Sequence, residues 1–294
     1  MKLRNSPSDR GISELLSFGV INVDKPPGPS SHQISAWVRD MIGVEKAAHT
    51  GTLDPKVTGS LPVLLGDATR LSEILLGKKE YIVVLEIHKL LKNDEDLKQV
   101  LENFIGDIYQ KPPKKSAVSR SLRVREIEEI ELIDYEKKRA LLRVRCASGT
   151  YIRKLCHDIG LVLGSGGHMG DLRRTMSFPF TDKNLVKMHE LVDAIDAWKN
   201  DGEEDELRNI VLPGEVLLEG IPKIIIAESA AKNVAKGSPI YAPGIISIEM
   251  EKISEDNNRV ACYTPNGAVV CLGRYVGGMG LEKEKIVELE RVLV

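Results

Sequence analysis

The sequence contains few cysteines and no long hydrophobic run. Its four cysteines (Cys146, Cys156, Cys262 and Cys271) include no C-x-x-C pair, so the usual spacing of zinc and redox motifs is absent. No apolar run approaches the roughly 20 residues that a membrane-spanning helix needs. The first ten residues, MKLRNSPSDR, lack the apolar segment of a signal peptide. These absences favour a protein of the reducing cytoplasm that does not act in a membrane.

Charged residues are plentiful, and their two signs are segregated along the chain. The 294 residues are 42% hydrophobic and 29% charged, which excludes a disordered chain and suits one large and one small domain. Residues 111–125 hold six bases and no acid, whereas residues 126–136 hold six acids and no base. Further basic pairs are Lys78/Lys79, Arg153/Lys154 and Arg173/Arg174. One such run alone is typical of a solvated face, but several together favour a face that binds RNA or DNA phosphates.

Short strands and helices follow one another in irregular order, which predicts an α+β fold with a mixed sheet. Strands are expected over residues 20–23, 80–88 and 140–148, which are rich in β-branched residues. Apolar periodicity and capping residues predict three helices: from Ser30 or Ser31 to Gly43, from Asn93 or Asp94 onward, and up to Gly164.

The composition changes after Trp198. The segment KNDGEEDELRNIVLPGE is polar and turn-rich, which suits a connection between domains. From Ile221 onward, short β-like segments alternate with Gly and Pro, and one small helix is expected over residues 229–236. This pattern predicts a small C-terminal β-barrel of about 70 residues, within the usual size range of a domain.

Two other motifs fail on their spacing. The segment GSGGHMG, residues 164–170, has Met169 where a G-x-G-x-x-G phosphate loop requires glycine, so a helix stop and turn is expected there. Cys156, His157 and His168 fit no standard zinc pattern, and we expect ordinary buried or surface residues.

Asp54 stands out in the stretch AAHTGTLDPKVTGSLPVLLG, residues 47–66. Gly51 and Gly59 bracket a loop, and Pro55 restricts the residue before it to an extended backbone. The apolar run that follows can anchor this loop to the core. An Asp-Pro pair alone is more often a turn cap, but a rigid loop can also hold a carboxylate out into a cleft.

Several ordered motifs together resemble one family. HTGTLDPKVTG, KKEYIVVL, SGTYIRKLCHDIG and HMGDLRRT are similar to the tRNA pseudouridine synthase B family, in its archaeal and eukaryotic dyskerin-type (H/ACA) branch. KGSPIYAPGI and PNGAVVCLGRY resemble the PUA RNA-binding domain that follows in that branch. The resemblance covers residues 18 to about 290. It implies a mixed-sheet catalytic domain over residues 1–218, in which 1–17 are a flexible or PUA-packing segment, and a PUA domain over 219–294.

The resemblance also implies an activity and its residues. An enzyme of this family isomerises uridine to pseudouridine in RNA, such as the T-loop uridine of tRNA or uridines of rRNA, without cofactor or metal. The catalytic aspartate falls on Asp54, the base-stacking tyrosine on Tyr81 and the active-site arginine on Arg153. A carboxylate can act as a nucleophile or stabilise positive charge as the C1′–N1 bond breaks, and the sequence leaves both routes open. The expected RNA-binding residues are His49, Lys56, Lys114, Lys115, Arg120, Arg123, Arg173 and Arg174.

Partners follow from the same branch, whose members act with an H/ACA guide RNA and small accessory proteins. Two other functions stay open. A non-catalytic RNA-binding scaffold would not need Asp54 or Arg153 at their motif positions. A hydrolase acting at the nucleoside C1′ would normally use a second carboxylate, which the loop of Asp54 lacks.

Overall fold

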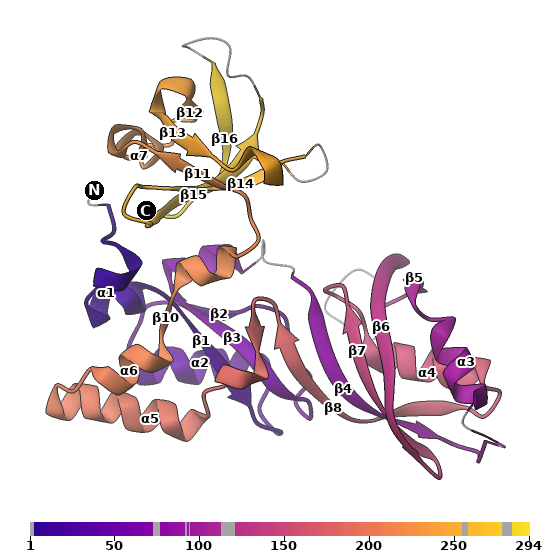
Figure 1. The fold of residues 1–294 in the computed structure, drawn as a ribbon. Coiled ribbons are helices and arrows are strands. Elements are labelled where there is room, and N and C mark those ends of the chain that lie inside the picture. Colours follow the sequence, from indigo (N-terminus) through magenta and orange to yellow (C-terminus); the bar gives the residue numbers. More distant parts are fainter. Residues whose placement is uncertain are drawn as a thin grey trace.

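A computed structural model describes residues 3–72, 77–91, 93, 95–112, 121–254, 258–277 and 284–294. Figure 1 shows a long curved sheet with helices at both ends and a smaller C-terminal sheet above one end. The predicted α+β class with a mixed sheet and a small C-terminal barrel is confirmed. None of the helices in the described ranges is long and apolar enough to span a membrane.

The large sheet has ten strands in the order β10-β1-β3-β8-β4-β7-β6-β5, with β2 added on β3 and β9 on β8. Its one parallel pair among the described strands joins β3 to β8, and the other pairs are antiparallel. The strands are β1 Phe18–Lys25, β2 Ala47–His49, β3 Thr58–Gly66, β4 Lys79–Ile87, β5 Gly106–Gln110, β6 Arg123–Glu136, β7 Arg139–Cys146, β8 Gly167–Ser177, β9 Phe180–Thr181 and β10 Leu212–Pro213. β8 therefore lies in the middle of the sheet, between the strand that follows Asp54 and the strand that carries Tyr81.

Helices cover the two ends of this sheet (Figure 1). They are α1 Ile12–Ser17, α2 Ser31–Ile42, α3 Glu95–Glu102, α4 Ile152–Val162, α5 Met188–Asp196 and α6 Asp205–Ile210. α2 begins and ends where the sequence predicts. Ser30 closes a capping box with Gln33, and Gly43 ends the helix at φ +87°, a left-handed backbone that glycine adopts without strain. α3 and α4 lie within the regions predicted to be helical.

The C-terminal barrel contains a six-stranded sheet in the order β12-β16-β15-β14-β11-β13. Its elements are β11 Lys223–Ile226, α7 Glu228–Val234, β12 Ile240–Tyr241, β13 Ile245–Ile248, β14 Arg259–Tyr263, β15 Val269–Tyr275 and β16 Lys285–Val292. The predicted small helix corresponds to α7.

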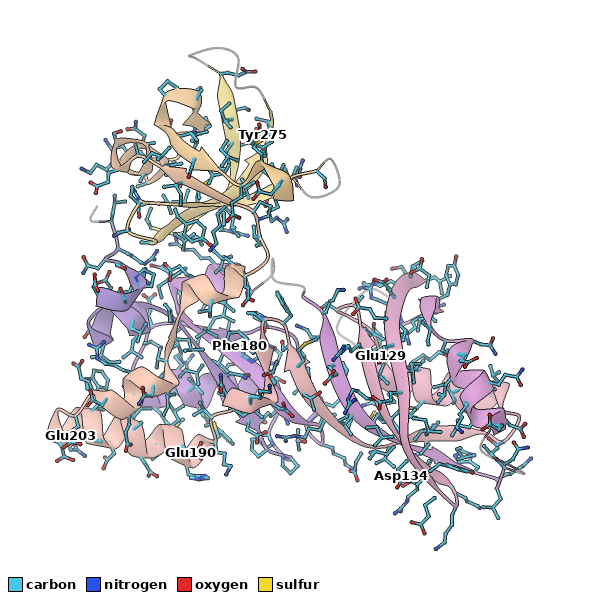
Figure 2. The ribbon with its side chains drawn as sticks, viewed as in Figure 1. Glu129, Asp134, Phe180, Glu190, Glu203 and Tyr275 are labelled. Carbon is cyan, nitrogen blue, oxygen red and sulfur yellow. The ribbon has the colours of Figure 1, made fainter. Side chains whose placement is uncertain are left out.

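An apolar cluster joins the barrel to the large sheet. Phe18 of β1 is fully buried in it, together with Tyr263 and Val269 of the barrel. Phe180 belongs to the same cluster and lies between the two ends of the large sheet in Figure 2. Burial of apolar surface from both sheets thus holds the barrel against β1.

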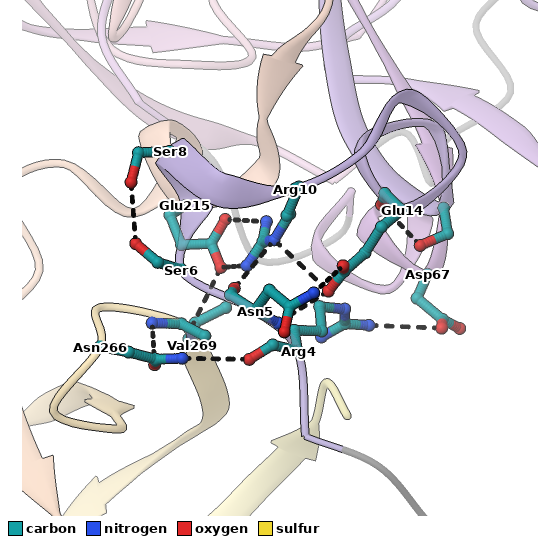
Figure 3. A network of polar contacts seen from close by, with 12 residues as sticks. Arg4, Asn5, Ser6, Ser8, Arg10, Glu14, Asp67, Glu215, Asn266 and Val269 are labelled. Atoms are coloured by element: carbon teal, nitrogen blue, oxygen red, sulfur yellow. Dashed lines mark hydrogen bonds and ion pairs between the residues drawn. The ribbon is translucent and has the colours of Figure 1, made fainter.

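The N-terminal segment lies at this junction, where it packs against the barrel (Figure 3). The carbonyl of Arg4 accepts a hydrogen bond from the side chain of Asn266 at 3.2 Å, and Leu3 packs against the apolar core of the barrel. The first 17 residues were expected to be either flexible or packed on the PUA domain. These contacts agree with packing on the C-terminal domain.

The predicted connection after Trp198 is wrong. Residues 205–213 instead form α6 and the strand β10, which pairs with β1 and extends the large sheet. Leu207 and Val211 are buried in the main core. The polar composition of this segment hides them, because a short helix at the surface needs few apolar residues.

The acidic stretch 126–136 lies in β6. Its exposed side chains, such as Glu129 and Asp134, project from the outer end of the sheet (Figure 2). Glu129 and Glu131 form ion pairs with Arg145 and Arg143 of the neighbouring strand β7. This face is therefore a solvated surface of paired charges.

Candidate active site

Asp54 lies in a tight loop, residues 50–57, between β2 and β3. The N–H of Val57 donates to the carbonyl of Asp54 at 3.0 Å. The residue before it, Leu53, is buried, and its N–H and carbonyl both bond the hydroxyl of Ser31 in the first turn of α2, at 2.8 and 3.0 Å. The side chain of Asp54 is 52% exposed. A fixed backbone therefore presents this carboxylate to solvent.

Lys25, at the end of β1, supports the same loop from below. Its side chain is fully buried, and its ammonium donates to the carbonyls of Pro26, Pro55 and Val57 at 2.8–3.0 Å. Burial lowers the pKa of Lys25, and the nearby charge of Asp54 acts in the opposite direction. Lys25 was not among the residues predicted for the site; its signal in the sequence is a lysine directly before the Pro-Pro-Gly turn that ends the first strand.

Gly59 marks the exit from the loop. Its backbone has φ +102°, and a Cβ there would lie 2.2 Å from the carbonyl oxygen of Arg174 on β8. β3 and β8 approach closely because they form the parallel pair at Thr58 and Gly59. Only glycine fits this position, as the bracketing glycines of the sequence suggested.

Arg153 lies in the first turn of α4 and forms an ion pair with Asp54 through Nη2 and Oδ2. The start of α4 is fixed by the buried side chain of Gln110 at the end of β5, which bonds both the N–H and the carbonyl of Tyr151 at 2.9 and 3.2 Å. The two predicted residues are thus brought together from positions 99 apart in the chain. The planar guanidinium orients the carboxylate, which suits attack on carbon or stabilisation of positive charge.

Tyr81 lies on β4, next to Arg174 of β8 in the sheet register. Its side chain is 8% exposed. Burial raises the pKa of the Tyr81 phenol, while the Arg174 guanidinium near its hydroxyl opposes that shift. The hydroxyl therefore stays protonated at neutral pH and can donate a hydrogen bond.

His49 ends β2 and faces the same region. Its ring meets that of His32 edge-on, with 4.8 Å between the centroids. The pKa of His49 is lowered to about 4, first by burial and then by the charges of His32 and Arg174. His49 is therefore neutral at pH 7. Its Nδ1 is buried without a hydrogen-bond partner among the described residues.

The prediction that Arg174 belongs to an exposed basic face needs correction. Its side chain is 1% exposed, and its guanidinium donates to the carbonyls of Ser60 and Gly51 at 2.7 and 3.1 Å. Successive side chains of a strand point to opposite faces of the sheet. Arg173 accordingly points the other way and forms a bidentate pair with Asp24 at 3.0 and 3.1 Å.

The other basic pairs do not act together as one surface either, because their members are buried or paired with acids. Lys78 is exposed and pairs with Glu128, whereas its neighbour Lys79 is buried. Lys154 pairs with Asp158 one helical turn away, so the basic pairs do not form one continuous phosphate-binding face.

Of the remaining predicted RNA-binding residues, Lys56 is exposed in the loop of Asp54, and Arg123 lies partly exposed at the start of β6. Lys114, Lys115 and Arg120 lie outside the described residues. Within the described part of the chain, no group of three or more His, Cys, Asp and Glu side chains is arranged to hold a metal ion.

Four sequence profiles match consecutive parts of the chain. The N-terminal domain of the TruB family of pseudouridylate synthases matches residues 39–152, and the C-terminal domain of tRNA pseudouridylate synthase B matches residues 153–219. The DKCLD domain matches residues 2–35 and the PUA domain residues 222–290. These profiles span the motifs on which the sequence resemblance was based.

Similar proteins cover almost the whole chain. A probable tRNA pseudouridine synthase B of Halobacterium salinarum is 53% identical over 304 residues and covers 100% of both chains. One of Methanosarcina acetivorans is 48% identical over 92% of this chain and 79% of its own.

Two solved structures have the same fold throughout. The first, a Cbf5-Nop10-Gar1 complex, contains a chain that is 40% identical, with a TM-score of 0.91 over 100% of this chain and 90% of that one. The second is an H/ACA RNP bound to a substrate RNA containing 2′-deoxyuridine, with 38% identity and a TM-score of 0.89 over 99% of this chain and 90% of that one.

Proposed function

The chain belongs to the TruB family of pseudouridine synthases, and from this premise we propose that it isomerises uridine to pseudouridine in RNA with Asp54, Arg153 and Tyr81 as its catalytic residues. The observation that carries the assignment is the ion pair between Asp54 and Arg153. It joins two separate motifs at one exposed point. Four hydrogen bonds hold the adjacent loop in place: the Ser31 hydroxyl donates to the Leu53 carbonyl and accepts from the Leu53 N–H, and the Lys25 ammonium donates to the carbonyls of Pro55 and Val57.

The proposed reaction begins when the target uridine leaves its stack and enters the site, at a cost of a few kcal/mol. The ring of Tyr81 offers a flat face for the extruded base. Arg153 fixes the orientation of Asp54 through a planar guanidinium. The carboxylate then acts at C1′ or on the pyrimidine ring, or stabilises positive charge as the glycosidic bond breaks.

RNA binding is proposed to draw on exposed or partly exposed residues of the catalytic domain, three of them basic and one the neutral ring of His49. Lys56, Arg123, Arg173 and His49 remain candidates, and Arg174 is left out because it is buried. Lys114, Lys115 and Arg120 remain candidates from the sequence alone. The proposed division is a catalytic domain over residues 1–218 and a PUA RNA-binding domain over 219–294, supported by the PUA match at 222–290.

The partners are proposed to be those of an H/ACA particle. The similar solved chains occur in complexes with Nop10 and Gar1 and with substrate RNA. We therefore expect this chain to act as the catalytic subunit, with a guide RNA that selects the uridine by base pairing. The four free and buried cysteines support a reducing compartment such as the cytoplasm.

Product analysis of treated RNA tests the chemistry. The wild-type chain should convert uridine to pseudouridine, whereas released uracil would indicate a hydrolase and unchanged RNA a scaffold. Asp54→Asn should abolish conversion while RNA affinity stays nearly the same, because the charge is lost but size and loop contacts remain. The matched control is Asp134→Asn, an exposed acid at the far end of β6 (Figure 2), which should convert at the wild-type rate.

Reconstitution tests the particle. We expect weak activity of the isolated chain on tRNA and stronger activity once guide RNA and accessory proteins are added. When the pairing arms of the guide are changed, the modified uridine should move with them. A uridine that stays the same would favour a stand-alone enzyme acting on the T-loop of tRNA.

A further inference from the structure

Two buried cations lie side by side beneath the catalytic loop. Lys79 of β4 is 4% exposed and Arg174 of the adjacent strand β8 is 1% exposed. Lys79 shares one face of β4 with Tyr81, which is the partner of Arg174 in the sheet register. The pKa of Lys79 is lowered to about 7, first by burial and then by the charge of Arg174.

This pair has no acidic partner among the described residues. The ammonium of Lys79 donates to the hydroxyl of Ser177 at 2.9 Å, and Arg174 donates to two backbone carbonyls, so the hydrogen-bond acceptors are neutral. Glu80, between Lys79 and Tyr81, points to the opposite face and binds Arg145 and Thr175. Buried charges are normally paired, because an uncompensated one costs several kcal/mol. Among the described residues, Arg10 is 2% exposed and has Glu215 as its partner.

The two cations lie close to the loop that carries Asp54. A Cβ added at Gly51 would lie 3.5 Å from Nη1 of Arg174 and 4.0 Å from Cε of Lys79, so Arg174 contacts the loop three residues before Asp54 and the Lys79 side chain lies close to it. Arg174 also binds the carbonyls on both sides of that loop, at Gly51 and Ser60. Its guanidinium further influences Tyr81, whose ring is the proposed stacking face.

The proposed reaction produces an anion at this place. When the C1′–N1 bond breaks, its electron pair stays on the uracil ring and is shared among N1, O2 and O4. The ring then turns, C5 bonds to C1′, C5 loses its proton and N1 gains one, so the net change is an isomerisation. Fixed cations that are themselves buried from water stabilise such a developing charge without reorganisation during the reaction.

On the basis of the proposed function, we propose that Lys79 and Arg174 form a buried cationic pair that stabilises the uracil anion during isomerisation. Both residues act electrostatically, at a distance, and do not touch the substrate. They are therefore positioning residues and not catalytic ones. The species that the pair stabilises is a heterocyclic anion. A purely structural role of the two side chains would involve no such anion.

The test compares Lys79→Met with two controls. Lys79→Arg keeps the positive charge, and Ser177→Ala removes the hydrogen-bond partner of Lys79 while leaving its charge. Single-turnover rates are measured on RNA that carries uridine or 5-fluorouridine at the target position, with consumption of that nucleotide as the readout. Fluorine withdraws electrons from the ring and stabilises the anion by itself.

We expect Lys79→Met to slow uridine conversion roughly 10- to 100-fold, less than the roughly 100- to 1,000-fold lost with a direct oxyanion donor. RNA affinity should be unchanged, because the lost charge is buried. The deficit should shrink with 5-fluorouridine, whose anion needs less help. Lys79→Arg and Ser177→Ala should stay close to the wild-type rate.

A pH profile gives a second readout. The wild-type rate should fall as pH rises through about 7, because Lys79 loses its proton there, whereas Lys79→Arg should stay flat. The other groups that face this pair titrate elsewhere: the pKa of His49 is about 4, that of Cys146 is raised to about 11 by burial, and burial also raises that of Tyr81.

Equal losses on the two substrates, or identical pH profiles for wild type and Lys79→Arg, would overturn the proposal and leave Lys79 a structural support. If Lys79→Met does not fold, the pH profile of Lys79→Arg still decides. A wild-type chain that makes no pseudouridine refutes the proposed function itself. An active wild type with an equally active Lys79→Met refutes the cationic pair alone.

Discussion

Glu215 is expected to be the residue on which attachment of the C-terminal barrel depends most strongly. It lies in the 3₁₀ helix Gly214–Leu218 and accepts two hydrogen bonds from the guanidinium of Arg10, at 2.8 and 2.6 Å (Figure 3). It also accepts the N–H of Val269 of β15 at 3.1 Å. One carboxylate thus links the N-terminal segment, the end of the catalytic domain and the barrel.

Burial sets the size of the expected effect. The side chain of Arg10 is 0% exposed and that of Glu215 is 10% exposed. Removing one partner of a buried ion pair costs about 3–5 kcal/mol when the other charge stays buried without a close partner, and Arg10 would keep only Glu14, at 3.9 Å. We therefore expect Glu215→Ala to lower the free energy of unfolding by about 3–5 kcal/mol. Replacing both partners, as in Arg10→Met with Glu215→Leu, should recover most of this loss.

Urea unfolding followed by circular dichroism and tryptophan fluorescence measures these free energies. The control is Glu131→Ala, which breaks an ion pair whose side chains are 40% and 46% exposed and should cost about 1 kcal/mol or less. RNA affinity should fall in Glu215→Ala, while the rate of the bound complex should not. The reasoning is refuted if Glu215→Ala costs no more than the control, or if the double variant is as unstable as the single one.

Three further variants test the catalytic site. Arg153→Lys should lose most of its single-turnover rate at unchanged RNA affinity, because an ammonium cannot reproduce the planar fork that orients Asp54; a wild-type rate would make Arg153 a surface helix residue. Tyr81→Phe should bind RNA and react slowly, whereas Tyr81→Ala should also bind weakly, and equal behaviour of the two would contradict the stacking role. Gly59→Ala should unfold at lower urea and lose activity, because its φ of +102° and the carbonyl of Arg174 at 2.2 Å exclude a Cβ; an unchanged midpoint would show that β3 and β8 can separate.

The sequence predicted the local features of the fold well. The limits of α2 followed from Ser30 and Gly43, because capping depends on residues within one turn of the helix end. The loop of Asp54 followed from its two glycines and Pro55 for the same reason. The partnership of Asp54 with Arg153 came only from the family resemblance, since no local rule relates residues so far apart.

Two predictions failed because local composition does not report burial. Residues 199–215 read as a polar connection, yet β10 within them is held by backbone hydrogen bonds to β1, which depend little on side-chain type. Arg174 and Lys79 read as members of a basic surface. Side chains alternate between the two faces along β4 and β8, so neighbouring side chains point apart. This alternation does not tell which of the two neighbours points inward.

The sequence by itself determined several of the elements, the family and the residue types needed for the chemistry, because periodicity, caps and motifs are properties of neighbouring residues. The tertiary structure alone decided which charges meet. β8 enters the sheet between β3 and β4, and this topology places the guanidinium of Arg174 under the loop of Asp54 and beside Lys79. The environment of a charge depends on every chain segment packed around it, so an arginine that is a surface residue by composition becomes a buried part of the site.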